Sequence, residues 1–143
     1  MKKSDCREAA LIEKDIFKKA AWSEQDFEDT LDLSYAFYVT AKRSGRLLGI
    51  CGLRNLGGDG YISNVSVIAN ERGKGIAFGM LKYLMEYTAK VGVEAYTLEV
   101  RSKNRAARAL YTKLGFEDEG IRKDFYDDPR DDAVLMWKRK GNI

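Results

Sequence analysis

Apolar residues recur at helical spacing in the first part of the chain. Residues 4–19 place their apolar side chains on one face of a helix. Asp5 with Glu8 three residues later is typical of a capping box at the start of such a helix, and Ser23 with Asp26 repeats the spacing. The pattern predicts two helices, the first over residues 4–19 and the second from Ser23 onward.

The spacing of apolar residues then shortens to that of strands. Residues 36–43 and 46–53 are rich in β-formers and flank Ser44-Gly45, which predicts a hairpin. The glycine-rich stretch 57–60 predicts a second turn, leading into a strand at about 61–68. Three consecutive strands joined by short turns predict an antiparallel part of a sheet.

Helices and strands alternate in the rest of the chain. The expected elements are a helix with Ile76 on its apolar face, a strand over 95–100, a helix around 105–114, a strand from Phe116 and a last strand over 133–138. Hairpins followed by this alternation predict an α/β fold. We expect a mixed, mostly antiparallel sheet of six or seven strands, flanked by about four helices.

Length and composition limit the classes of protein. A chain of 143 residues predicts a single domain over residues 1–143. Hydrophobic residues at 45% and charged residues at 33% are typical of a globular protein rather than a disordered one. The longest apolar run is far below the roughly 20 residues of a membrane span, and no apolar secretory core follows the N-terminus. We expect a cytoplasmic protein with no membrane partner.

Charge and residue usage argue against several kinds of chemistry. The net charge of +3 is too small to indicate nucleic-acid binding. The chain has no histidine, which removes Ser-His and Cys-His mechanisms and most zinc sites, so we expect no metal. Cys6 and Cys51 make no disulfide framework, as is usual in a reducing compartment.

Residues 64–77 are the most informative segment for function. An expected strand runs into a turn that contains Gly73 and Gly75, and an amphipathic helix opens directly behind it. Glycines let the backbone approach a ligand closely, and the N–H groups at the start of a helix favour a phosphate. Arg72 and Lys74 add positive charge beside them. The segment therefore indicates a phosphate-binding turn.

Three phosphate-binding motifs compete for this segment. A dinucleotide fingerprint requires glycine three residues after Gly75, where Phe78 stands. A Walker loop requires Gly-Lys-Ser/Thr after four spacers, a string that the sequence lacks. Arg72, Gly75 and Ala77 satisfy Arg-x-x-Gly-x-Gly/Ala, the signature of the GNAT superfamily. A plain helix-capping turn without a ligand stays open as the alternative.

A second set of residues surrounds the end of the strand expected at 95–100. Glu99 lies near the end of this strand, Asn104 can start the next helix, and Tyr111 lies one turn beyond Ala107. Acylation of an amine requires a base for an ammonium proton and an acid for the leaving thiolate. Glu99 is the candidate base and Tyr111 the candidate acid. For each residue alone, a solvated strand glutamate and a core tyrosine are the alternatives.

The sequence resembles the GNAT acetyltransferases over almost its whole length, and within them the RimI type, the ribosomal-protein-alanine N-acetyltransferases. The stretches that carry the resemblance are Asn64-Val65-Ser66-Val67, Leu98-Glu99-Val100-Arg101 with Asn104 and Ala109-Leu110-Tyr111, Phe125-Tyr126 with Asp131-Asp132-Ala133-Val134-Leu135-Met136, and Trp22-Ser23. The chain departs from the family pattern at Ala21, Ser66 and residues 68–70, and its first strand is short or missing. These departures bear on the acceptor more than on the cofactor.

The resemblance implies a splayed sheet that binds acetyl-CoA as co-substrate between two strands. It implies Glu99 and Tyr111 as catalytic base and acid. The cofactor-binding residues that it implies are Val65, Ser66, Val67, Arg72, Gly73, Lys74, Gly75, Ile76, Ala77, Asn104, Ala107 and Tyr111. It also implies three acceptor-binding residues, namely Asn64 with Phe125 and Tyr126, the last two on a loop over the incoming peptide.

The implied reaction is direct attack of an amine on the thioester in a ternary complex, with no acyl-enzyme. The implied acceptor is a protein or peptide N-terminus, with a ribosomal protein among the candidates. We expect a monomer or a weak homodimer. Two alternatives stay open: a GNAT enzyme for a small amine such as a polyamine or an antibiotic, and a non-catalytic CoA-binding module.

Overall fold

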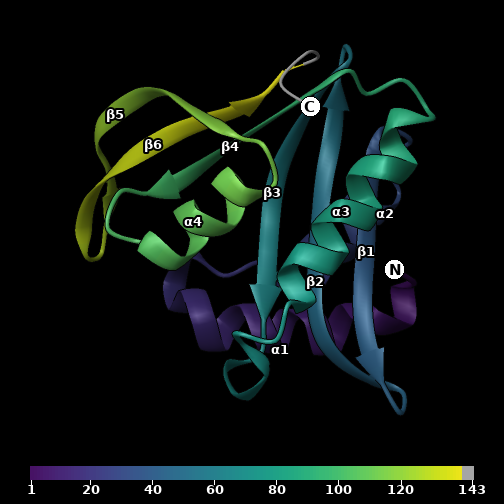
Figure 1. Cartoon of the computed structure of the whole chain (residues 1–143). Coiled ribbons are helices and arrows are strands. Elements are labelled where there is room, and N and C mark those ends of the chain that lie inside the picture. Colours follow the sequence, from purple (N-terminus) through teal and green to yellow (C-terminus); the bar gives the residue numbers. More distant parts are fainter. Residues whose placement is uncertain (140–143) are drawn as a thin grey trace.

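The computed structural model describes residues 1–139. In chain order its elements are η1 (Lys3–Asp5), α1 (Cys6–Phe17), η2 (Lys18–Ala20), α2 (Glu24–Leu31), β1 (Ala36–Arg43), β2 (Arg46–Leu56), β3 (Asp59–Val67), η3 (Ala69–Glu71), α3 (Ile76–Ala89), β4 (Ala95–Arg101), α4 (Arg105–Lys113), β5 (Glu117–Asp127) and β6 (Arg130–Lys138), where η is a short 3₁₀ helix (Figure 1). Within residues 1–139, none of the helices has the length and apolar character that a membrane span requires.

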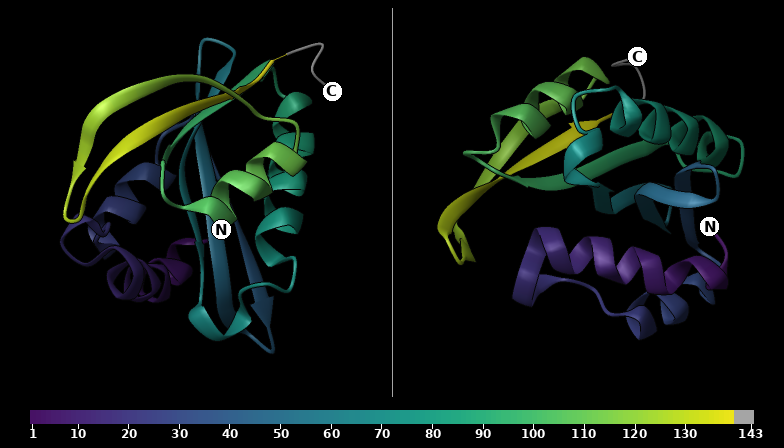
Figure 2. Two further views of the ribbon diagram at one scale, coloured as in Figure 1. Left: turned by 60° about the vertical axis from the view of Figure 1, so that its left-hand side comes forward. Right: turned by 90° about the horizontal axis from the view of Figure 1, so that it is seen from below.

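All six strands form one sheet, in the order β1-β2-β3-β4-β6-β5. The β3–β4 pair is parallel and the other neighbouring pairs are antiparallel. Helices α3 and α4 cover one face of the sheet, and α1 and α2 cover the other (Figure 2). The structure confirms the predicted mixed, mostly antiparallel sheet flanked by helices, with six strands in the described part of the chain.

Apolar side chains fill the space on both faces of the sheet. The larger cluster lies under α3 and α4 and includes Leu53, Leu81, Leu84, Phe116 and Met136, each at most 2% exposed. A smaller cluster joins α1 and α2 to the opposite face. Burial of one such large side chain contributes about 1.5–3 kcal/mol, so these two clusters hold the four helices on the sheet.

Most predicted boundaries agree with the structure, and the differences have local causes. The first helix ends at Phe17 rather than near residue 19, because Lys18 leaves the helical region with a φ of 53°. β3 begins at Asp59, inside the predicted turn, since Gly57 and Gly58 alone reverse the chain with positive φ. The last strand begins at Arg130, earlier than predicted.

The predicted capping box at the start of α2 is confirmed. The Asp26 N–H donates to Ser23 Oγ at 3.0 Å, and the Ser23 N–H donates to the Asp26 carboxylate at 2.8 Å. Two backbone donors that the helix leaves unused are satisfied in this way. The box fixes where the chain turns from the loop after α1 into α2.

The predicted capping box of Asp5 and Glu8 at α1 is wrong. The Asp5 carboxylate accepts the Lys2 N–H at 2.9 Å and pairs with Lys42 of β1 at 2.7 Å. Glu8 accepts the Leu47 N–H of β2 at 2.7 Å. Each carboxylate makes one tertiary contact, Asp5 with Lys42 and Glu8 with the Leu47 N–H, and these contacts tie α1 to the β1–β2 hairpin.

A glycine in β2 makes room for an aromatic side chain from β1. Tyr38 lies opposite Gly52, which lies opposite Asn64 of β3, and a Cβ at Gly52 would overlap the Tyr38 ring. The Tyr38 hydroxyl donates to Asn64 Oδ1 at 2.5 Å and lies 2.9 Å from Ser63 Oγ. The ring therefore crosses β2 and couples three neighbouring strands.

Gly52→Ala should lower the free energy of unfolding by about 1–3 kcal/mol, because the new Cβ overpacks against the Tyr38 ring. Gly79→Ala in α3 is the control, since nothing lies within 4 Å of a Cβ there and alanine should stabilise the helix by about 0.5–1 kcal/mol. Denaturant unfolding of the three proteins measures both effects. Equal stability of Gly52→Ala and the wild type would contradict the overlap.

Candidate active site

β3 and β4 pair over a short length and then separate. Their parallel pairing ends at Tyr61 and Thr97 after three residue pairs. Beyond this point β3 stays with β2 as far as Val67, while β4 stays with β6 as far as Arg101. The two strands diverge toward their carboxyl ends (Figure 1). We call the divergent segments, residues 62–67 and 98–101, the β3–β4 fork.

The backbone of β3 presents polar groups toward β4 in the fork. The Ile68 N–H donates to Leu48 O of β2 at 2.9 Å. Ile68 and Leu48 are therefore a hydrogen-bonded pair, and hydrogen-bonded and non-hydrogen-bonded pairs alternate along an antiparallel ladder. Val67 and Val65 lie one and three residues before Ile68, so they belong to non-hydrogen-bonded pairs with β2. Their N–H and C=O groups therefore point away from β2 and into the fork.

The glycine turn follows at the end of β3. Gly73 and Gly75 have φ of 77° and 82°, which favours glycine, and nothing lies within 4 Å of a Cβ at either position. The Gly79 N–H donates to Gly75 O at 3.0 Å at the start of α3. Within the described part of the chain, the N–H groups of residues 73–78 donate to no backbone acceptor. The turn thus presents a row of amides at the positive end of a helix.

The two cations beside this turn are held by neighbours. Arg72 Nε donates to Val67 O at 3.1 Å. Lys74 Nζ lies 2.9 Å from one Glu71 oxygen, and an Arg43 nitrogen lies 2.6 Å from the other. The hydrogen bond from Lys74, and then Arg43, hold the pKa of Glu71 below its usual value in spite of burial. An ionised Glu71 therefore fixes Lys74 beside the amides.

Glu99 projects from β4 on the face opposite α3 and α4, since its neighbours Leu98 and Val100 lie in the larger core cluster. The Tyr61 hydroxyl donates to Glu99 Oε1 at 2.7 Å. Oε2 is buried and accepts no hydrogen bond from the described residues, although Arg122 Nε lies 3.4 Å away as an ion-pair partner. One oxygen is fixed in place, and the other has free lone pairs.

Tyr111 lies on α4, on the other face of the sheet. It is 7% exposed, and its ring centroid lies 5.9 Å from that of Phe116. Burial raises the pKa of Tyr111 far above its usual value, and the nearby Cys51 and Tyr126 raise it further. The phenol is therefore a protonated donor at physiological pH. No hydrogen bond of the described residues joins it to Glu99, which lies on the opposite face of β4.

Phe125 and Tyr126 lie in β5, so the expected loop position is wrong. Their rings pack edge to face with centroids 5.0 Å apart, and the Arg101 guanidinium lies 4.3 Å over the Tyr126 ring. The β5–β6 register shifts between Arg122 and Tyr126, where Asp124 has a φ of 53°. This bulge, rather than a loop, directs the two rings toward the end of β4.

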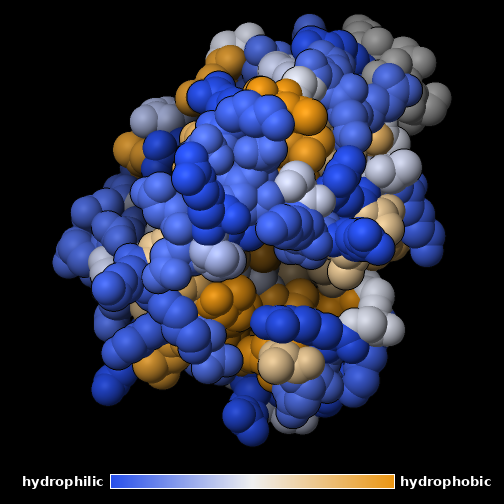
Figure 3. All heavy atoms as spheres, turned by 90° about the vertical axis from the view of Figure 1, so that its left-hand side faces the viewer, coloured by the Kyte–Doolittle hydropathy of each residue, from blue (hydrophilic) through white to orange (hydrophobic). Residues whose placement is uncertain are grey.

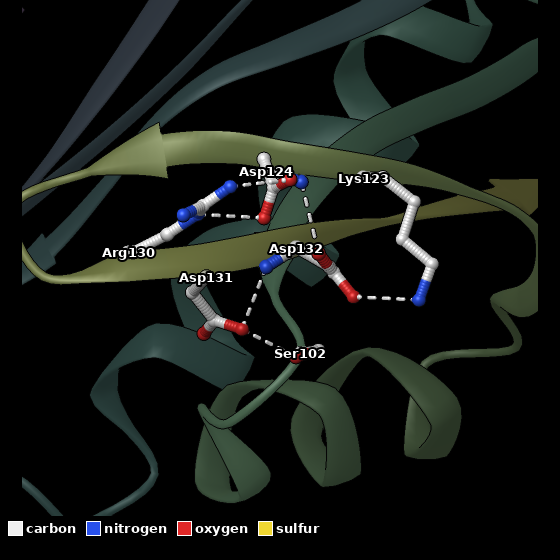
Figure 4. Close-up of polar contacts among 6 residues, drawn as sticks. All are labelled: Ser102, Lys123, Asp124, Arg130, Asp131 and Asp132. Atoms are coloured by element: carbon white, nitrogen blue, oxygen red, sulfur yellow. Dashed lines mark hydrogen bonds and ion pairs between the residues drawn. The ribbon is translucent and has the colours of Figure 1, made fainter.

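The Asp131 carboxylate anchors the β5–β6 hairpin to the loop after β4, and the Asp132 carboxylate closes a bond within the hairpin (Figure 4). Asp131 accepts from Ser102 Oγ at 2.5 Å and from the Lys103 N–H at 3.2 Å, and Asp132 accepts the Asp124 N–H at 2.9 Å. The Ser102 bond is the largest cause of a lowered pKa at Asp131.

Residues 1–139 hold no group of three or more His, Cys, Asp or Glu side chains arranged for a metal ion.

Asn64 and Ser66 turn their side chains toward α1. Asn64 Nδ2 lies 3.4 Å from Glu13 Oε1, and Ser66 Oγ donates to Glu13 Oε2 at 2.5 Å. Burial raises the pKa of Glu13, against these bonds and one from the Trp22 N–H. Asn64 is 4% exposed and its polar atoms are bonded, so direct contact with an acceptor would require one of these bonds to break.

The other predicted cofactor residues lie at two helix starts. Asn104 Oδ1 accepts the Ala107 N–H at 3.1 Å, which confirms the predicted start of α4 just beyond the end of β4. Ala107, Ile76 and Ala77 are partly buried against the larger core cluster. Both helix starts follow the carboxyl ends of the fork strands.

The side of the molecule that carries the β5–β6 hairpin is mostly polar but has an apolar hollow. Figure 3 shows this hollow below the region of β5 and β6 and above that of α1. Phe17 of α1 and Phe125 of β5 are exposed large apolar residues of these elements, whereas Ile121 lies opposite Val134, on the face of the larger core cluster. The hollow lies on the side of the molecule that carries Phe125.

Both side chains that contact Glu99 were missed by the sequence analysis. Tyr61 reaches it because β3 and β4 are parallel neighbours, and Arg122 reaches it from β5, on the far side of β6. A tyrosine and an arginine in strands carry no local signal of such a role. Only the strand order and register bring them to the carboxylate.

Comparison with protein families agrees with this arrangement. The model described as the acetyltransferase (GNAT) family matches residues 6–116. The chain belongs to the GNAT acetyltransferase family. It is therefore an N-acetyltransferase, and its splayed six-stranded sheet is the GNAT fold.

The relatives of this GNAT enzyme confirm the resemblance to the RimI branch. A putative ribosomal protein bS18-alanine N-acetyltransferase of Bacillus subtilis is 32% identical over 117 residues, 81% of this chain and 78% of the relative. The ribosomal protein bS18-alanine N-acetyltransferase of Escherichia coli K12 is 31% identical over 118 residues, 80% of this chain and 78% of the relative. A crystal structure of the Escherichia coli ribosomal-protein-S18-alanine N-acetyltransferase is similar with a TM-score of 0.86 and 27% identity, covering 97% of this chain and 90% of that one.

Asp131→Asn should flatten the acid dependence of stability in this GNAT enzyme. The folded-state pKa of Asp131 lies below its ordinary value, so its contribution is present above the ordinary aspartate range and is lost as pH falls through the folded pKa. The variant should unfold at lower denaturant concentration at pH 7 and lose less stability below about pH 4. Ser102→Ala should act in the same direction. Identical unfolding profiles from pH 2 to 7 for Asp131→Asn and the wild type would contradict this role.

Proposed function

We propose that this enzyme transfers the acetyl group of acetyl-CoA to the N-terminal α-amine of a protein, of the ribosomal-protein-alanine type. The observation that supports this most is the β3–β4 fork, with Glu99 on one face and Tyr111 on the other. The B. subtilis and E. coli relatives, named for acetylation of a ribosomal-protein alanine, support the acceptor class. The apolar hollow beside the hairpin is suited to the first residues of a peptide.

The fork and the glycine turn fit the two polar parts of acetyl-CoA. The outward backbone groups of Val65 and Val67 match the amides of the pantetheine arm, which would extend β3 on its open side. The amides of residues 73–78 and the positive end of α3 favour the pyrophosphate, with Lys74 close by. Asn104 would contact the arm from the β4 side.

The acceptor would approach from the face of the sheet that carries Glu99. A proton of its ammonium group passes to Glu99 Oε2, directly or through water, and frees the nitrogen lone pair. Phe125 and Tyr126 would cover the first peptide residue. Because Tyr61 holds Oε1, the carboxylate keeps its orientation while Oε2 is protonated.

In the transfer step the amine nitrogen forms a bond to the thioester carbonyl carbon. A backbone N–H at the β3 edge would stabilise the negative charge on the carbonyl oxygen. The carbon–sulfur bond then breaks, and Tyr111 gives its proton to the departing sulfur. The second amine proton replaces the one that Tyr111 lost, so the products are an amide, the CoA thiol and one proton released through Glu99.

The buried cysteines support direct transfer rather than an acyl-enzyme. Cys6 and Cys51 are both 0% exposed, and burial raises the pKa of Cys51 to about 12. Only the thiolate is a good nucleophile. Neither side chain is therefore suited to attack a thioester.

The native enzyme should keep its activity after treatment with a thiol-specific reagent at pH 8. Burial protects both thiols, so mass spectrometry should find them labelled only after unfolding. Labelling of either thiol in the folded protein with parallel loss of activity would argue for an acyl-cysteine.

The proposed function is tested by CoA release with a peptide beginning Ala-Arg, an N-blocked copy of that peptide, and spermidine. Turnover should require the free peptide amine. Glu99→Gln should lower kcat/KM by about 10²–10⁴-fold because the base is lost. The control is Glu119→Gln in β5, whose carboxylate pairs with Arg139 at 2.7 Å; it should behave as the wild type.

Other outcomes of this assay point to the alternatives. Turnover of spermidine but not of the peptide would indicate a small-amine enzyme. Calorimetric binding of acetyl-CoA without turnover of any amine would indicate a non-catalytic module. Absence of acetyl-CoA binding would contradict the proposal that the fork and the glycine turn bind this cofactor.

A further inference from the structure

An arginine of the chain itself lies against the candidate base. Arg122 Nε is 3.4 Å from Glu99 Oε2, the oxygen that Tyr61 leaves unbonded. An ammonium group that gives a proton to Glu99 needs the same side of the carboxylate. The guanidinium and an acceptor amine are both cations, so they would compete for one place.

The sheet determines how Arg122 reaches this place. It lies opposite Ala133 of β6, and Ala133 lies opposite Arg101 of β4. Directly opposed residues in an antiparallel sheet share a face, so Arg122, Ala133 and Arg101 lie on one face. Glu99 is two residues before Arg101 in β4 and therefore lies on that face too, with β6 between it and Arg122. Ala133 is small, which leaves the long arginine side chain a path across β6 to Glu99.

The contact is weak compared with other ion pairs of the same hairpin. Arg130 forms two hydrogen bonds to Asp124, at 2.9 and 2.8 Å. Arg122 makes none to Glu99, although Oε2 is buried, and its side chain is 58% exposed. Its guanidinium also lies 5.9 Å from the Phe125 ring, a second favourable place for a cation.

We propose that Arg122 is an internal competitor for the acceptor amine. It occupies the cation position at Glu99 Oε2, and the acceptor ammonium displaces it toward Phe125 and solvent before proton transfer. Tyr61 stays bound to Oε1 throughout, so the carboxylate does not turn. Arg122 thereby weakens amine binding at Glu99, because the amine must displace the guanidinium before it can reach the base. This inference rests on the proposed function, because it needs Glu99 to receive a proton from an amine.

The test compares Arg122→Gln with Lys123→Gln, the adjacent position on the same strand. Lys123 is 80% exposed and pairs with Asp132 at 3.3 Å, away from Glu99, so both variants remove one positive charge from the hairpin. Calorimetry measures binding of the Ala-Arg peptide to the CoA-bound enzyme and binding of acetyl-CoA alone. Kinetics gives KM and kcat for the same peptide.

Removal of the competitor should tighten peptide binding. The Arg122 guanidinium is largely exposed, so its ion pair with Glu99 has only the modest strength of a surface pair. The enzyme must still release the guanidinium from Oε2 before an amine can bind there, and the apparent affinity for the amine rises when this cost is removed. Arg122→Gln should therefore lower the peptide Kd and KM roughly two- to sixfold. Acetyl-CoA affinity should not change, and Lys123→Gln should bind the peptide like the wild type.

Several outcomes would overturn the proposal. Weaker peptide binding or lower kcat in Arg122→Gln would show that the arginine positions Glu99 instead. Equal tightening in both variants would show a general charge effect. A lower thermal midpoint only in Arg122→Gln with unchanged affinity would give it a purely structural role. Failure of the wild type to bind or acetylate the peptide is a separate result that refutes the proposed function itself.

Discussion

The parallel contact between β3 and β4 covers three residue pairs, and the rest of the site depends on where it stops. Up to Tyr61 and Thr97 the two strands satisfy each other's backbone groups. Beyond them each strand keeps its outer partner, and the inner edges separate. Buried backbone groups need partners, so the open edge of β3 is a place where an extended ligand can complete the sheet. The glycine turn and α3 begin where this edge ends.

The same separation explains how one acid and one base can serve a single reaction without touching. Glu99 reaches the fork from the face opposite α3 and α4, where Tyr61 orients it. Tyr111 reaches it from the face beneath α4, where burial keeps the phenol protonated. A continuous sheet would isolate the two groups from each other. The Asp131 bonds to Ser102 and Lys103 matter here because they hold the hairpin, and with it Arg122 and Tyr126, close to β4.

Features set by neighbours in the sequence could be predicted from it. The capping box of Ser23 and Asp26, the Asn104 cap and the glycine turn each depend on a few consecutive residues, and the structure has all of them. The same rule failed for Asp5 and Glu8, because Asp5 instead binds the Lys2 N–H and Lys42, and Glu8 binds the Leu47 N–H of β2. Tyr61 and Glu99 are 38 residues apart, and their contact depends on the β3–β4 register. No local pattern specifies that register.

The Tyr38 ring over Gly52 has a consequence for how this sequence can change over time. A larger residue at 52 is blocked while the ring is present, and loss of the ring leaves a hole beside Asn64 that a glycine cannot fill. The two positions lie on different strands and can be altered safely only as a pair. Among related chains we expect positions 38 and 52 to change together, and we expect few chains that carry a change at only one of them.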